Sequence, residues 1–119
     1  MTLVLVLLGA ALGAPARYLV DRAIQARHTS GFPWGTFAVN VSGSFLLGLI
    51  AASAVSGSHL AFLGTGFCGA FTTYSTFAYE TLLLARNGSR SRATLNALVS
   101  VTAGVAAVYL GLLVASVLQ

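Results

Sequence analysis

GTGFCGAFTTYSTF, residues 64–77, decides the fold, because it is a glycine-rich and polar stretch inside an otherwise apolar segment. A membrane-spanning helix that meets such a run is expected to break. In a bilayer a broken helix is tolerated only where protein or a water-filled cavity satisfies the freed backbone groups. Discontinuous helices near the membrane midplane are typical of ion and substrate sites in transport proteins. The stretch therefore predicts a transport protein with its site at residues 69–77.

The composition also indicates a membrane protein. Of the 119 residues 57% are hydrophobic and 7% are charged, whereas soluble domains carry about 25% charged residues. All six basic residues are arginines, and the acids are Asp21 and Glu80. A basic balance can indicate nucleic-acid binding, but these arginines fall at the expected helix ends, which fits membrane orientation instead. We expect lipid around the chain and no nucleic-acid partner.

Hydropathy predicts an all-α chain with four transmembrane helices and no extramembrane domain. The expected spans are residues 2–21, 35–55, 60–85 and 94–118, in a single domain that comprises residues 1–119. About 20 apolar residues cross the hydrocarbon core of a bilayer. A signal peptide is the alternative for the first span, but no basic residue precedes it and three more spans follow. Gly9 and Gly13, four residues apart, predict a close helix contact.

Four spans place both termini on one side of the membrane and the basic turns on the other. The turns hold five arginines: Arg22, Arg27, Arg86, Arg90 and Arg92. The positive-inside rule therefore predicts that these turns lie in the cytoplasm and that both termini lie outside. We expect a multi-pass protein of the plasma membrane. The polar residues within the spans gather in the same half, so one chain offers a polar vestibule that ends near the membrane centre.

A complete polar path requires a second chain. Two chains in opposite orientation, related by a two-fold axis in the membrane plane, would place one polar half in each leaflet and bring the broken helices together. A parallel oligomer with a dry gate is the alternative. A chain that inserts both ways is expected to have balanced turn charges. The strong bias here leaves open an antiparallel homodimer or a heterodimer with a homologous chain of opposite charge bias.

Three motifs carry a resemblance to a known family. GAPARY (residues 13–18), GTFAVNVSGSFLLG (residues 35–48) and GFCGAFTTYSTFAYE (residues 66–80) resemble the signatures of the Fluc/CrcB family of small fluoride channels. The resemblance implies an antiparallel dual-topology dimer, two fluoride pores and a structural sodium ion at the dimer centre. The implied function is passive export of fluoride from the cytoplasm, which confers fluoride resistance.

The resemblance places the sodium ligands at the backbone carbonyls of Gly69 and Thr72 in each of two subunits. A helix break frees carbonyl oxygens, and hard cations favour oxygen ligands. The alternative is that Gly69 and Thr72 only pack the break.

The resemblance also implies a fluoride pathway along the broken helix and its neighbours. The family's pore aromatics correspond to Tyr74, where the family usually has phenylalanine, and Phe77. The electropositive edge of an aromatic ring can face an anion without trapping it. Asn40 matches the family's pore asparagine and offers neutral N–H donors. Further candidates with polar side chains are Ser75, Thr76, Asn96 and Ser100. The alternative for each polar residue is an interhelical hydrogen bond.

Arg17 and Glu80 are the ionisable groups expected within the spans. Each would be costly if it were unpaired at a helix centre, so we expect them to pair or to extend to the interface. Arg17 would then raise the local anion concentration at the vestibule, and Glu80 would lie next to the pore, three residues beyond Phe77.

No nucleophile with a base and an acid is found in the sequence, so an enzyme is not expected. The alternative function is a proton-coupled small-molecule exporter of the four-helix dual-topology type. Such an exporter needs a carboxylate that faces the substrate in the first span, and residues 2–20 hold none.

Overall fold

The computed structural model describes residues 2–27, 32–53 and 57–118. The expected end of the second span at residue 55 lies outside the described residues. The described chain is all-helical, without strands. Its elements are α1 (Thr2–Gln25), α2 (Trp34–Ala52), α3 (Gly57–His59), η1 (Leu60–Cys68), α4 (Gly69–Phe71), α5 (Ser75–Arg86) and α6 (Arg90–Leu118).

Three helices of the described chain, α1, α2 and α6, are long and apolar enough to cross a membrane. The molecule measures 47 × 30 × 22 Å along its principal axes. Its long axis matches the thickness of a bilayer with its headgroups, about 40–45 Å. The length and the apolar surface of the helices together fit a chain embedded in lipid.

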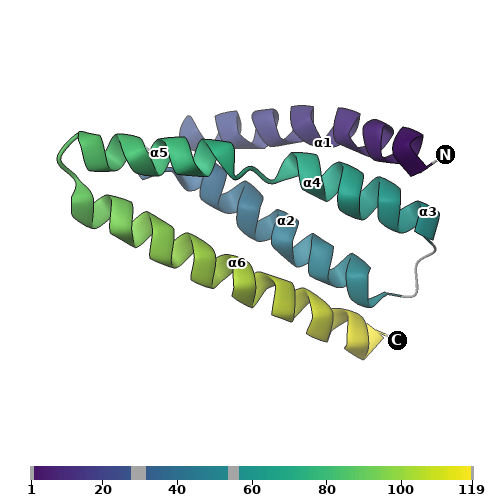
Figure 1. The fold of residues 1–119 in the computed structure, drawn as a ribbon. Helices are drawn as coiled ribbons and strands as arrows, with labels where there is room; N and C mark the ends of the chain where they lie inside the picture. The colour runs from purple at the N-terminus through teal and green to yellow at the C-terminus, as the bar shows by residue number, and fades with distance from the viewer. Residues whose placement is uncertain (1, 28–31, 54–56, 119) are drawn as a thin grey trace.

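The third segment consists of two short helical halves. The first half, η1 followed by α4, begins as a π-helix and ends at Phe71. Thr72 has extended backbone angles, φ −82° and ψ 162°, and α5 starts at Ser75. Figure 1 shows α4 and α5 nearly end to end with the extended link between them. The interruption lies inside the glycine-rich and polar stretch of the sequence.

Glycines let the helix backbones approach closely around the broken segment. A Cβ added at Gly9 would lie closer to the carbonyl oxygen of Phe62 than van der Waals contact allows, and one at Gly13 would meet Phe67 in the same way. The close contact predicted from these two glycines is therefore confirmed, and its partner is η1. Gly48 and Gly111 bring α2 and α6 together in the same manner.

The two ends of the molecule differ in charge. One end holds the start of α1 and the end of α6, and the other holds the α5–α6 turn, the end of α1 and the start of α2 (Figure 1). Five of the six arginines belong to the second end, in the last turns of α1 and α5, just after α1, or in the first turn of α6: Arg22, Arg27, Arg86, Arg90 and Arg92. We call it the basic end.

Candidate functional site

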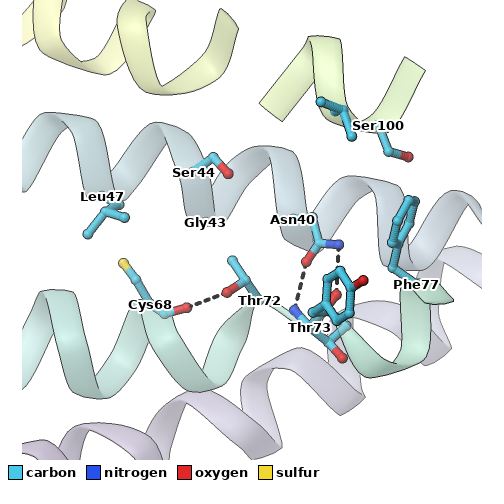
Figure 2. Close-up of a pocket in the computed structure, with 11 residues that line it drawn as sticks. Asn40, Gly43, Ser44, Leu47, Cys68, Thr72, Thr73, Phe77 and Ser100 are labelled. Atoms are coloured by element: carbon cyan, nitrogen blue, oxygen red, sulfur yellow. Dashed lines mark hydrogen bonds between the residues drawn. The ribbon is translucent and has the colours of Figure 1, made fainter. Parts of the chain in front are cut away.

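Two hydrogen bonds join α2 to the interruption of the third segment. The Asn40 Nδ2 donates to the carbonyl oxygen of Thr73 at 3.0 Å, and the Thr73 N–H donates to Asn40 Oδ1 at 2.7 Å. Figure 2 shows both bonds. Thr73 is 8% exposed, so its backbone groups would otherwise be buried without partners, at a cost of about 1–3 kcal/mol each. The Asn40 side chain thus supplies the hydrogen bonds that a helical turn would otherwise give to Thr73.

At the interruption, two backbone carbonyls lack the N–H donors that they would have in a continuous helix. In an uninterrupted helix the N–H of Thr73 would bond to the carbonyl of Gly69, and the N–H of Thr76 to that of Thr72. The first N–H goes to Asn40 instead, and the second donates to Thr73 Oγ1 at 3.2 Å. The carbonyls of Gly69 and Thr72 therefore lose their usual helical partners.

Gly69 lies on an exposed face of the chain. Its position is open, because a Cβ added there would meet nothing within 4 Å. The Thr72 hydroxyl donates to the Cys68 carbonyl at 2.9 Å, so its proton is bound within the first half of the third segment, and the backbone oxygen of Thr72 is the ligand that the interruption itself frees. Two carbonyl oxygens without their helical donors, one of them on an exposed residue, fit the oxygen chemistry that a hard cation requires.

An open cavity of about 320 Å³ lies beside the interruption, between α2, α6 and the third segment. We call it the Asn40 cavity. Its lining comprises Asn40, Gly43, Ser44, Leu47, Cys68, Thr72, Thr73, Tyr74, Phe77, Ser100 and Val101. The structure thus brings four of the expected pathway residues, Asn40, Tyr74, Phe77 and Ser100, to one cavity. The rings of Tyr74 and Phe77 are 6.3 Å apart between centroids, and Tyr74 is 81% exposed.

The other expected pathway residues lie elsewhere. Asn96 is 1% exposed and bonded at both amide atoms, since its Nδ2 donates to Thr81 Oγ1 at 2.8 Å and its Oδ1 accepts from Ser100 Oγ at 3.1 Å. Ser75 is exposed, and its hydroxyl is 3.5 Å from the hydroxyl of Thr73. Neither residue lines the Asn40 cavity. Asn96 instead connects α6 to α5.

A second polar cavity of about 140 Å³ lies between α1, α2 and the third segment. It is lined by Arg17, Tyr18, Asp21, Thr36, Val39, Thr73 and Thr76, and we call it the Arg17 cavity. Thr73 lines both cavities, so the residue held by Asn40 forms part of the wall between them. Thr76 therefore faces the Arg17 cavity, on the other side of this wall.

The two expected ionisable residues do not meet. Glu80 accepts a hydrogen bond from the hydroxyl of Thr36, while Arg17 lines the cavity named after it. No ion pair between Arg17 and Glu80 is found in the part of the chain that the structure describes. Asp21 has a buried carboxylate oxygen, Oδ1, without a hydrogen-bond partner among the described residues.

The roles of three threonines were not predicted from the sequence. Thr36 holds Glu80, Thr73 carries the contact with Asn40, and Thr81 accepts from Asn96. Thr36 precedes Asn40 by four residues and so shares its helical face. Thr73 stands three residues before Thr76 at the start of a helix, which is the spacing of a capping threonine. These two spacings were the available signals.

Comparison with known proteins places the chain in a family. It matches the family described as CrcB-like protein, Camphor Resistance (CrcB), over residues 4–112. A Streptomyces avermitilis protein named fluoride-specific ion channel FluC 1 is 52% identical over 115 residues, which cover 93% of each chain. A Frankia casuarinae protein of the same name is 52% identical over 120 residues, with the same coverage. A Shewanella pealeana protein named fluoride-specific ion channel FluC is 46% identical over 110 residues, or 89% of each chain.

Proposed function

Because this chain belongs to the CrcB-like family, we propose that it forms a fluoride-selective channel that exports fluoride from the cytoplasm across the plasma membrane. The relatives named as fluoride-specific channels match over almost the whole chain. A passive channel needs no coupling residue. A membrane potential that is negative inside drives an anion outward, by about 2.3 kcal/mol per charge for each 100 mV.

The observation that carries this proposal is the Asn40 cavity with its neutral donors and aromatic rings. One N–H of the Asn40 amide is bound to Thr73, and the amide carries a second N–H. The edges of Tyr74 and Phe77 add weak positive potential without a formal charge. A site of this kind binds a small anion strongly enough to replace its water and weakly enough to release it.

Ser100 contributes at the far wall of the same cavity. Its hydroxyl donates to Asn96, so in this arrangement its oxygen rather than its proton is available. A hydroxyl rotates easily, and rotation of Ser100 toward the cavity would give a passing fluoride one more donor. In this proposal Asn96 accepts the hydrogen bond from Ser100 while no fluoride ion is passing.

The exposed backbone at Gly69 supports a dimer. A carbonyl without its helical donor is not tolerated against hydrocarbon, so this face of Gly69 requires protein or an ion beside it. We propose that a second chain in the opposite orientation packs there, with the two-fold axis near Gly69. The carbonyls of Gly69 and Thr72 from both chains would then hold the structural sodium ion, which when bound would satisfy these four oxygens.

The partner is either an identical chain or a homologous one of opposite charge bias. Five of the six arginines belong to one end of the molecule, and the positive-inside rule disfavours inserting half of the chains in the reverse orientation. This asymmetry supports the heterodimer, whereas the sodium site proposed at the interruption is compatible with either arrangement.

Fluoride efflux from liposomes that contain only this chain tests the proposal. We expect efflux driven by a fluoride gradient and a potassium-valinomycin potential, without any proton or sodium gradient. Efflux that requires an imposed pH gradient would instead favour the proton-coupled exporter. If the pure chain is silent, co-reconstitution with a homologue of opposite charge bias tests the heterodimer, and silence of that mixture too would contradict the channel.

A further inference from the structure

Two apolar grooves flank Trp34 near the basic end. The first, of about 350 Å³, is lined by Phe32, Trp34, Arg92, Leu95 and Val99. The second, of about 490 Å³, follows α2 away from the basic end and is lined by Ile24, Trp34, Phe37, Ala38, Val41, Ser42, Phe45, Ala107 and Leu110. We call the two grooves together the Trp34 surface.

We propose that the Trp34 surface binds one phospholipid with an anionic headgroup. Its phosphate would bind Arg92, and its acyl chains would lie on the two sides of Trp34. This lipid site is independent of the fluoride pathway, because none of its residues lines the Asn40 cavity or the Arg17 cavity.

The second groove is suited to hydrocarbon. Its only hydroxyl side chain, that of Ser42, donates to the Ala38 carbonyl at 2.6 Å, so the Ser42 proton is already bound within α2. The groove reaches from Trp34 to Phe45 along α2, a rise of about 16 Å at 1.5 Å per residue. That length corresponds to one leaflet of the hydrocarbon core, about 15 Å.

The aromatic residues fix the depth of this surface in the membrane. Phe32 and Trp34 have ring centroids 4.7 Å apart, and the ring of Phe37 stands edge-on to Trp34 at 5.9 Å. Tryptophan prefers the headgroup level of a bilayer. Arg92, in the first turn of α6, therefore lies where a phosphate group would be.

The charge at the head of the first groove selects an anionic lipid. A guanidinium carries five N–H donors in a fork that matches phosphate, so Arg92 can bind a phosphate in addition to any contact with the protein. Arg86 and Arg90, at the α5–α6 turn, add positive potential at the same end. A net negative headgroup gains from this potential, whereas a zwitterionic one gains less.

A second copy of the chain is the competing occupant, and its charges do not complement Arg92. An inverted copy would present its other end, where the described residues include no arginine and no acidic side chain. A parallel copy would present its own arginines, and its Glu80 is engaged by Thr36. A lipid phosphate is therefore the better anion for this surface.

Trp34 is the only tryptophan in the chain, so its fluorescence reports on this surface alone. The protein is reconstituted in two sets of vesicles of the same composition, phosphatidylglycerol diluted in phosphatidylcholine. The bromine label is carried in one set by a small fraction of the phosphatidylglycerol and in the other by an equal fraction of the phosphatidylcholine. We expect brominated phosphatidylglycerol to be enriched about fivefold over brominated phosphatidylcholine near Trp34, the factor that one arginine gives near an anionic surface.

Arg92→Gln should remove this preference, while Arg86→Gln, which removes a charge at the same end but lines neither groove, should retain it. Equal quenching by the two brominated lipids in the unmodified chain would overturn the proposal. Absence of quenching by either lipid would also overturn it, since it would mean that protein covers Trp34. The readout does not depend on fluoride flux, so its failure is distinct from failure of the proposed function.

Discussion

The side chain of Asn40 replaces a helical turn for the backbone of Thr73, with bonds of 3.0 Å to its carbonyl and 2.7 Å from its N–H. This contact ties α2 to the interruption and leaves the carbonyl of Gly69 without its helical donor. The Asn40 side chain thus contributes both to helix packing and to the cation site proposed at Gly69.

Substitution of Asn40 should affect both stability and conduction. Asn40→Ala leaves two buried backbone groups of Thr73 unpaired, and we expect a loss of about 1–3 kcal/mol per group together with a large loss of fluoride efflux. Ser44→Ala is the matched control, because Ser44 lines the same cavity one turn further along α2. Thermal unfolding in detergent and electrode-based efflux measure the two effects. Equal behaviour of the two variants would refute the role of Asn40.

The contact between α1 and η1 should be sensitive to a single methyl group. Gly9→Ala directs a Cβ into the backbone of Phe62, and such overpacking costs about 1–3 kcal/mol. Gly104→Ala is the control, because the nearest atom to its Cβ would be Ser44 Oγ at 3.8 Å, an ordinary contact. The thermal midpoint should fall for Gly9→Ala only; a normal midpoint would mean that α1 moves aside freely.

The hydrogen bond from Thr36 to Glu80 should stabilise the approach of α2 and α5. Thr36→Val keeps the shape but removes the donor, and we expect a loss of about 1–3 kcal/mol because a carboxylate oxygen is left unpaired. Thr36→Ser keeps the donor and should retain most of the stability. If the valine variant unfolds at the same temperature as the serine variant, the bond contributes nothing measurable.

The sequence predicted the parts of this molecule that depend on local pattern. Apolar runs of about 20 residues indicated the spanning helices, Gly9 and Gly13 indicated a close helix contact, and residues 64–77 indicated the interruption. The partners of the buried polar groups could not be predicted. Thr36 with Glu80 and Asn96 with Thr81 are pairs between different helices, and a single sequence does not specify how helices rotate against one another. The π-helical winding of η1 left no sequence signal either.

Sodium should stabilise the assembled channel rather than drive transport. Replacing sodium with choline should lower the temperature at which the purified dimer dissociates, because the carbonyls of Gly69 and Thr72 would lose the cation proposed to satisfy them. Lithium and potassium salts at the same ionic strength control for the general screening of charges by salt. An unchanged dissociation temperature in choline would mean that sodium does not stabilise the dimer.

We propose that the interrupted third segment is shared by two inverted copies. Gly69→Cys and Thr65→Cys, each in a Cys68→Ala background, test it by disulfide formation in membranes, because both positions lie on the same exposed face one turn apart. In an inverted pair centred on Gly69, two copies of position 65 would be offset along the axis by twice the rise of four residues, which is about 12 Å at the α-helical rise and somewhat less in the π-helical winding of η1. A disulfide requires Cα atoms within about 7 Å of each other.

We therefore predict rapid cross-linking of Gly69→Cys, with fluoride efflux retained, and little cross-linking of Thr65→Cys. A homologue of opposite charge bias that carries the equivalent cysteine replaces the second copy if the chain pairs only with such a partner. Equal cross-linking at both positions would indicate parallel copies, and none at Gly69→Cys in either pairing would show that the third segments do not meet. Either result would contradict an inverted pair of chains that meet at their interrupted third segments.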